Sequence, residues 1–173
     1  ANEATMNAAK DAGKTVNVTL FANNAAEIMV SPASRFVGRI TDIASLSDAV
    51  NSGIKVGVCV ATAPCGSLAN SILEKVETTR SAIADTESPS VEDLVTKIEM
   101  GELDAGIVYR SDCQYALLRS AATCVVIPRT INSTNGYYVT ALTKRSIVQQ
   151  YVDYINSSDF ASVLQTKFGF LAP

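Results

Sequence analysis

The sequence predicts an α/β fold, in which one complete α/β lobe is joined to an incomplete second lobe. Ile54–Val60 and Leu103–Tyr109 are nearly continuous apolar runs, as expected of strands that helices cover on both faces. Between them, apolar residues recur at i, i+3, i+4 and i+7 from Val91 to Ile98, the spacing of a helix with one apolar face. The 173 residues are 47% apolar and 18% charged, so the chain can build a sizeable core.

The N-terminal part begins with the tail of a helix, Thr5–Ala12, which ends at Gly13. Apolar and polar residues alternate over Val16–Phe21, and a second strand-like run follows over Ala25–Val30. No helix separates these two runs. They are therefore expected to form one extended segment that passes from one lobe to the other and stops before Pro32.

The middle of the chain alternates helices with strands. A short helix is predicted over Ile43–Val50, and a second helix begins at Pro64 and runs to about Val76. The polar stretch Glu77–Pro89 is interpreted as a connection with room for a short helix. Ser90 is expected to cap the helix that follows, because its hydroxyl can accept a backbone N–H three residues on.

The C-terminal part follows the left-handed cap expected at Gly101. Its predicted elements are strand Leu103–Tyr109, a helix from Ser111 to Leu118 capped by Ser111, strands Cys124–Ile127 and Tyr137–Leu142, and helices Ile147–Ile155 and Phe160–Lys167, the last capped by Asp159. The complete lobe is assigned to residues 25–128, and residues 1–24 and 129–173 are interpreted as a remnant of the other lobe.

Composition excludes several classes of function. The chain has no histidine, which rules out Ser-His-Asp and Cys-His catalysis and His-ligated metal sites. Its net charge of −3, with no basic cluster beyond Lys144-Arg145, disfavours nucleic acid and anionic membranes as partners. No phosphate-binding loop, dinucleotide fingerprint or nucleophile elbow occurs. We therefore expect neither an enzyme nor a resident cofactor or metal.

The four cysteines, Cys59, Cys65, Cys113 and Cys124, lack Cys-x-x-Cys spacing and allow three pairings. The most local pairing joins Cys59 to Cys65 and Cys113 to Cys124; the alternative is four buried thiols. Glycosylation sequons begin at Asn17, Asn132 and Asn156. Cysteines and sequons together favour an extracytoplasmic protein. The first residues lack the features of a signal peptide, so any such peptide is expected to be removed already.

The candidate binding site is at the carboxyl edge of the predicted sheet, where open α/β sheets bind ligands. Helices begin there at Cys65-Gly66 and at Val91, and their free backbone N–H groups suit a tetrahedral oxyanion. The Tyr109 hydroxyl can add a donor; the alternative is that Tyr109 only packs the strand edge. Asp104 and Asp112 are given structural explanations, Asp112 because it suits the first turn of a helix.

Several segments carry a resemblance to a known family. They are residues 3–6 (Glu-Ala-Thr-Met), 21–23 (Phe-Ala-Asn), 63–69 (Ala-Pro-Cys-Gly-Ser-Leu-Ala), 90–93 (Ser-Val-Glu-Asp), 101–112 (Gly-Glu-Leu-Asp-Ala-Gly-Ile-Val-Tyr-Arg-Ser-Asp), 151–155 (Tyr-Val-Asp-Tyr-Ile), 157–158 (Ser-Ser) and 167–170 (Lys-Phe-Gly-Phe). Together they resemble the periplasmic molybdate-binding proteins of ABC importers over essentially the whole chain. The resemblance implies a type II periplasmic-binding-protein fold.

The resemblance also implies a function and a site. In that family two lobes close over molybdate or tungstate, which neutral hydrogen-bond donors hold for delivery to the membrane component of an ABC importer. By position, Cys65 and Val91 take the places of backbone N–H donors, and Tyr109 takes that of the hydroxyl donor. The expected location is periplasmic, cell-surface or secreted.

One departure from the family leaves alternatives open. The chain begins after the family's first βα units, which carry the remaining oxyanion donors, so half of the donors and part of lobe one are expected to be missing. A separate N-terminal chain or a homo-oligomer could complete that lobe. Alternatively, the protein could be a secreted module that has lost ligand binding and acts in assembly through the exposed surfaces. The C-terminal strand and helices are in any case expected to expose apolar faces.

Overall fold

The computed structural model describes residues 3–15 and 17–173. Val16, the first residue of the strand expected over Val16–Phe21, lies outside the described residues. The chain forms two compact units: residues 1–24 with 134–173, and residues 25–133. The chain passes from the larger unit back to the smaller unit between Ser133 and Thr134, whereas the sequence predicted this boundary after Pro128.

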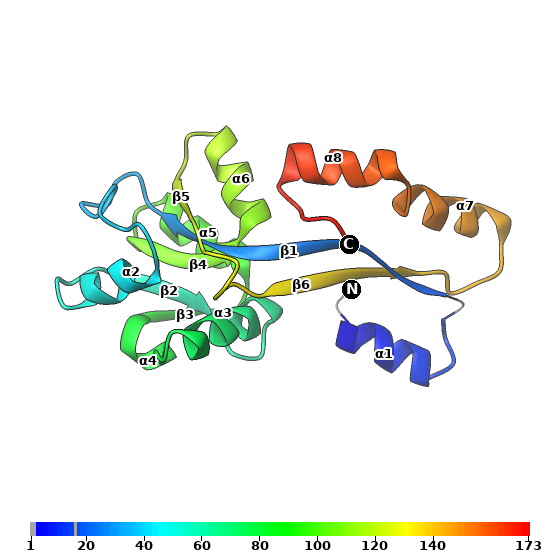
Figure 1. Ribbon diagram of the computed structural model, residues 1–173, viewed down its shortest axis with the longest axis horizontal. Coiled ribbons are helices and arrows are strands. Elements are labelled where there is room, and N and C mark those ends of the chain that lie inside the picture. The colour runs from blue at the N-terminus through cyan, green and yellow to red at the C-terminus, as the bar shows by residue number, and fades with distance from the viewer. Residues whose placement is uncertain (1–2, 16) are drawn as a thin grey trace. The chain divides into compact units, whose positions relative to one another are not determined.

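The larger unit is built on a mixed sheet whose strands lie in the order β3-β2-β4-β1-β5 (Figure 1). Strand β2 (Val56–Cys59) pairs in parallel with β3 (Thr86–Ser88) and with β4 (Ala105–Tyr109). Strand β1 (Val18–Val30) runs antiparallel to both β4 and β5 (Thr123–Val126). The two strand-like runs of the sequence thus form one long strand, over the residues described, as expected.

Helices cover both faces of this sheet (Figure 1). Helix α3 (Pro64–Lys75) lies on one face, together with α2 (Ile43–Val50) and α4 (Arg80–Ile83). Helices α5 (Val91–Glu99) and α6 (Arg110–Leu118) lie on the other. This alternation is what right-handed crossovers require when the chain moves first outward to β3 and then back past β2 to β4.

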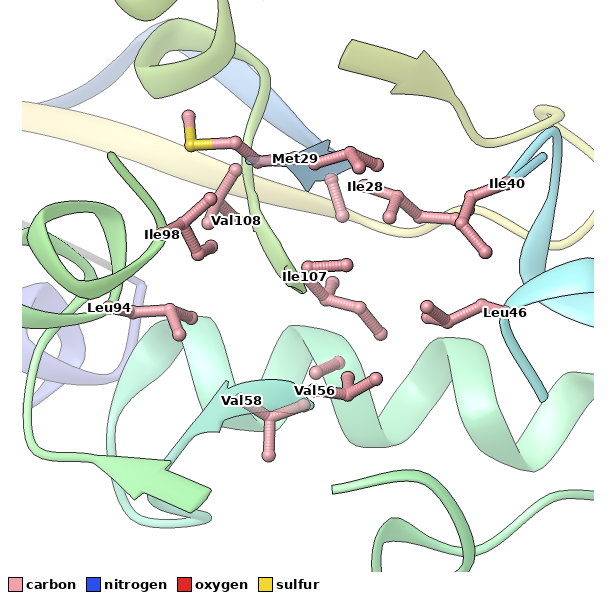
Figure 2. Packing of buried hydrophobic residues seen from close by; sticks show 14 of the residues in the cluster. Ile28, Met29, Ile40, Leu46, Val56, Val58, Leu94, Ile98, Ile107 and Val108 are labelled. Carbon is pink, nitrogen blue, oxygen red and sulfur yellow. The ribbon is translucent and has the colours of Figure 1, made fainter. Parts of the chain in front are cut away.

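The hydrophobic core fills the space between the sheet and these helices (Figure 2). Leu94 and Ile98 of α5 reach toward the sheet, as their spacing predicts, and both are fully buried. Other fully buried side chains come from every layer: Ile28, Met29, Ile43, Leu46, Val56, Ile72, Leu73 and Ile107.

Two glycines let α5 approach the sheet closely. A Cβ atom on Gly57 would lie 2.5 Å from the Cδ1 atom of Leu94, and one on Gly106 would lie 2.9 Å from the Cδ1 atom of Ile98. A Cβ atom on Gly106 would also lie 2.8 Å from the carbonyl oxygen of Gly57, so glycine at this position lets β2 and β4 pair closely under the apolar stripe of α5.

The structure corrects three local predictions. The connection Glu77–Pro89 contains strand β3 as well as the short helix α4, and the strand was not predicted. Helix α6 starts after Tyr109, so Ser111 lies inside the helix and is not its cap. Helix α8 (Ser158–Phe168) is capped by the hydroxyl of Ser157, which accepts the N–H of Phe160 at 3.2 Å, and not by Asp159.

Two predicted ends of α5 are confirmed. The Ser90 hydroxyl accepts the N–H of Asp93 at 3.3 Å, so Ser90 caps α5. Gly101 follows α5 with φ +75°, the left-handed conformation that glycine adopts without strain.

All four cysteines are paired. The disulfides are Cys59–Cys65 and Cys113–Cys124, each with a Cα–Cα distance of 5.8 Å. The local pairing is therefore found, and the alternative of four buried thiols is wrong. The first bond joins the end of β2 to the start of α3, and the second joins α6 to β5.

The smaller unit is held by aromatic contacts around β6 (Thr134–Thr140), which pairs with β1. The Tyr137 ring lies 5.4 Å from the Phe170 ring and 6.5 Å from the Phe21 ring, between centroids. Its helices are α1 (Glu3–Asp11), α7 (Ser146–Ile155) and α8. Large apolar side chains are exposed here, as expected, among them Leu142, Ile147, Tyr151 and Tyr154.

Asn132 fastens the end of the larger unit to its sheet. Its Nδ2 group donates to the carbonyls of Ala26 and Ile127, at 2.9 and 3.1 Å. Its Oδ1 atom accepts the N–H groups of Ala26 and Ser133, at 3.2 and 2.9 Å. The amide nitrogen of this sequon is thus engaged within the fold.

Replacing this side chain leaves several part-buried backbone groups without their partner. We expect Asn132→Ala to lower the free energy of unfolding by about 1–3 kcal/mol, measured by urea denaturation. Asn156→Ala is the control, because the exposed Asn156 amide makes a single bond to the carbonyl of Val152, and it should cost less than half as much. Equal losses in both variants would contradict this role for Asn132.

Candidate functional site

Three parallel strands end at one edge of the sheet and bring three helix starts together. Cys59 of β2 is level with Ser88 of β3, and Gly57 of β2 is level with Gly106 of β4. Helices α3 and α5 follow β2 and β3 after short turns, and α6 follows β4 directly (Figure 1). The structure therefore places Cys65, Val91 and Tyr109 along the carboxyl edge of adjacent strands, the usual ligand-binding edge of such sheets.

The start of α3 leaves two backbone N–H groups without a partner inside the helix. Pro64 is the first helical residue, and the first helical bond runs from the N–H of Ser67 to the carbonyl of Ala63, at 2.9 Å. The N–H groups of Cys65 and Gly66 precede that bond, so they have no acceptor within the helix. A Cβ atom on Gly66 would lie 2.0 Å from the carbonyl oxygen of Val60, so only glycine lets the helix start this close to β2.

The start of α5 offers a single donor of the same kind. Leu94 donates to the carbonyl of Ser90 at 3.2 Å, and Asp93 donates to the Ser90 hydroxyl. The N–H of Glu92 lowers the pKa of the carboxyl on its own side chain, with help from the Ser90 hydroxyl. Val91, which is half-buried, is left as the N–H donor of this first turn.

Tyr109 is the last residue of β4 and is 8% exposed. Its N–H donates to the Oδ2 atom of Asp112 at 3.2 Å, which fixes the first turn of α6. Asp112 therefore has the structural role expected for it. The fold holds Tyr109 rigidly, because its backbone is bonded both to the sheet and to the helix that follows.

The carboxyl groups of Asp112 and Glu92 lie at this edge and reduce the positive potential that the helix dipoles create there. The pKa of Asp112 is raised from 3.8 to about 6, chiefly because the group is buried. The Tyr109 N–H acts in the opposite direction, and the nearby Glu92 carboxylate raises the pKa further. Sequence reasoning missed this proximity of Glu92 to Asp112, because it depends on the packing of α5 beside α6.

A cation also lies near this edge and was not predicted. Arg80 of α4 donates to the carbonyl of Cys59, the last residue of β2, and its Nε atom lies 2.9 Å from Glu87. Its side chain is only 17% exposed. The sole sequence signal is an arginine in a polar connection, and that does not indicate burial.

The remaining acidic candidates have structural roles. Asp104 accepts the hydroxyl of Ser34 at 2.5 Å and the N–H of Lys55 at 2.8 Å, at the opposite end of β4. Glu27 is buried beside Cys113 and Cys124, but both sulfurs are bonded to each other. Burial raises the pKa of Glu27, and Arg110 lies 3.9 Å away. Among the described residues, Glu27, Cys113 and Cys124 form the one cluster whose residue types could hold a metal ion. Both of its sulfurs are bonded in the disulfide and are not available as thiolate ligands.

Residues 1–171 match the family of bacterial extracellular solute-binding proteins. The chain belongs to this family. Its members are solute-binding proteins and not enzymes, as the sequence predicted. None of the described helices is long and apolar enough to cross a membrane.

Individual relatives agree with this assignment. A molybdate-binding protein of Mycobacterium tuberculosis is 28% identical over 158 residues, which cover 90% of this chain and 57% of the relative. The chain thus spans little more than half the length of that curated relative.

Solved structures share the fold. The periplasmic molybdate-binding protein of Azotobacter vinelandii superposes with a TM-score of 0.78 at 14% identity, covering all of this chain and 76% of its own. L-phospholactate-bound PEB3, a Campylobacter jejuni protein, superposes with a TM-score of 0.75 at 13% identity, covering 99% and 76%. The periplasmic-binding-protein fold is therefore confirmed. These relatives give no support to the alternative of a secreted assembly module.

The raised pKa of Asp112 predicts a pH-dependent stability. Between about pH 4 and 6 the folded protein holds a proton on Asp112 that the unfolded chain has lost. The resulting stabilisation is complete below pH 4 and is lost as the pH rises through 6. Asp112→Asn keeps a carbonyl oxygen for the Tyr109 N–H but does not titrate.

From pH 4.5 to 7.5 the stability of Asp112→Asn should therefore improve relative to wild type, by about 1–2 kcal/mol after allowance for solvent screening. Urea denaturation at both pH values measures the difference. Parallel pH profiles for the two proteins would show that Asp112 does not titrate in this way.

Proposed function

We propose that this protein captures a tetrahedral oxyanion, molybdate or tungstate, outside the cytoplasm and delivers it to the membrane component of an ABC importer. The observation that carries the proposal is the position of two helix starts and a buried tyrosine at the carboxyl ends of adjacent parallel strands, in a member of a solute-binding family. The backbone N–H groups of Cys65 and Val91 and the hydroxyl of Tyr109 are the proposed donors.

The chemistry of these donors suits a small, doubly charged anion. Helix N-termini carry partial positive charge and aim N–H groups outward, so they bind an anion without a paired cation. Each hydrogen bond to a charged ligand contributes about 1.5–3 kcal/mol, so three donors are enough for binding. They do not satisfy all the acceptor positions of a tetrahedral oxyanion, and further donors would increase the affinity. Glu92 and Asp112 oppose the anion, because their carboxylates lie near the same helix starts.

The relatives' names favour this class of ligand. Two of them are molybdate-binding proteins, and PEB3 is seen with L-phospholactate, which carries a phosphate group. Molybdate and the phosphate group of L-phospholactate both present a tetrahedral arrangement of oxygens. Because the chain spans 57% of the curated relative, further donors in the family's binding site can lie on polypeptide outside these 173 residues.

Calorimetric titration with molybdate, tungstate, sulfate and phosphate tests the proposal. We expect micromolar or tighter binding of molybdate or tungstate to the wild-type protein. Tyr109→Phe should weaken that binding by about tenfold or more, since one charge-assisted hydrogen bond is lost. Tyr115→Phe is the matched control, because Tyr115 lies on α6 and is 58% exposed.

Three outcomes would count against the assignment. Absence of heat with all four anions would remove the capture function. Selective binding of phosphate or sulfate would replace the proposed ligand. Equal affinities for Tyr109→Phe and Tyr115→Phe would remove Tyr109 from the site.

A further inference from the structure

The two helix starts at the proposed site are held in place by different means. In α5 the Ser90 hydroxyl caps the first turn through the N–H of Asp93. In α3 the equivalent position is Ala63, which has no side-chain acceptor, and Pro64 follows it. An uncapped first turn frays readily, so α3 needs another restraint if its N–H groups are to hold a ligand.

The Cys59–Cys65 disulfide supplies that restraint. It joins the last residue of β2 to the second residue of α3, and Cys65 is the residue whose N–H is a proposed donor. Cys59 is fully buried and Cys65 is 7% exposed, so the bond lies within the packed edge of the sheet and not in a mobile loop.

Other contacts hold the turn but not the donor. Val60 donates to the carbonyl of Ser88 at 2.8 Å, and Ala63 donates to the carbonyl of Val60 at 3.0 Å. Arg80 donates to the carbonyl of Cys59. These bonds fix the β2 side of the turn, whereas the disulfide is a direct covalent link from the sheet to Cys65.

We propose that the Cys59–Cys65 disulfide positions the Cys65 and Gly66 N–H groups and thereby makes oxyanion affinity depend on the redox state. The inference rests on the proposed function. A dithiol that reduces the bond gives up two electrons and two protons; the cysteines become two thiols, and the dithiol closes to its own disulfide. The reduced protein keeps its fold but holds α3 less firmly, so it binds the anion more weakly.

This arrangement restricts tight binding to an oxidising compartment. Newly made chains in a reducing environment would carry thiols at Cys59 and Cys65, and would leave the oxyanion pool there untouched. Affinity would develop when the bond forms.

The second disulfide provides a matched control. Cys113–Cys124 also joins a helix to a strand with the same Cα–Cα distance, but neither cysteine is a proposed donor. The Cys59→Ala/Cys65→Ala and Cys113→Ala/Cys124→Ala double variants should therefore both lose stability. Calorimetry with molybdate should show roughly tenfold weaker binding for the first pair only, because preorganisation of the donor is lost.

Amide hydrogen exchange gives a readout that stability alone would not change. In Cys59→Ala/Cys65→Ala the amides at positions 65 and 66 should exchange faster, while that of Val91 should not. If this variant does not fold, Cys113→Ala/Cys124→Ala protein, in which Cys59–Cys65 is the remaining disulfide, is titrated with molybdate in dithiothreitol and again after reoxidation, and it should show the same loss and recovery of affinity.

The outcomes separate this inference from the proposed function. Wild-type protein that binds no oxyanion overturns both. Wild-type protein that binds molybdate, with unchanged affinity in Cys59→Ala/Cys65→Ala or after reduction, overturns the positioning role alone. An equal loss of affinity in both double variants also overturns it, since the effect would then follow general stability.

Discussion

The parallel pairing of β2 with β3 and with β4 is the constraint on which the rest of the structure depends. It aligns three strand ends and so places the starts of α3, α5 and α6 at one edge. Helices can pack closely on both faces of this sheet because three positions are glycine. Gly57 and Gly106 leave space for the apolar side chains of α5, and Gly66 leaves space for the start of α3 beside β2. A side chain at any of these glycines would separate the layers that carry the proposed donors.

Most of the fold could be predicted from the sequence because its signals are strong and local. Continuous apolar runs marked β2 and β4, and one amphipathic stripe marked α5. Strand β3 was missed because Thr86–Ser88 is short and polar, and its pairing with β2 is a long-range property. The caps at Ser111 and Asp159 were misplaced because α6 starts one residue, and α8 two residues, before the first helical residue that the apolar pattern indicates.

The positions of the proposed donors in the fold could also be predicted, since strand ends and helix starts follow from the same local patterns. The groups that modulate the site could not be. Glu92 and Asp112 lie on different helices, and the effect of Glu92 on the pKa of Asp112 exists only after folding brings α5 and α6 together. Arg80 reaches the end of β2 from a segment with no apolar pattern. Such contacts depend on tertiary packing, which residue spacing does not encode.

The central claim is that uncharged donors at this edge bind a small oxyanion. Amide chemical shifts, followed by NMR during titration with molybdate, test it most directly. The account predicts that the largest shift changes fall on the amides of Cys65, Gly66 and Val91, at the starts of α3 and α5, and that they saturate together. Saturable changes centred on other elements, with these three amides unmoved, would contradict it.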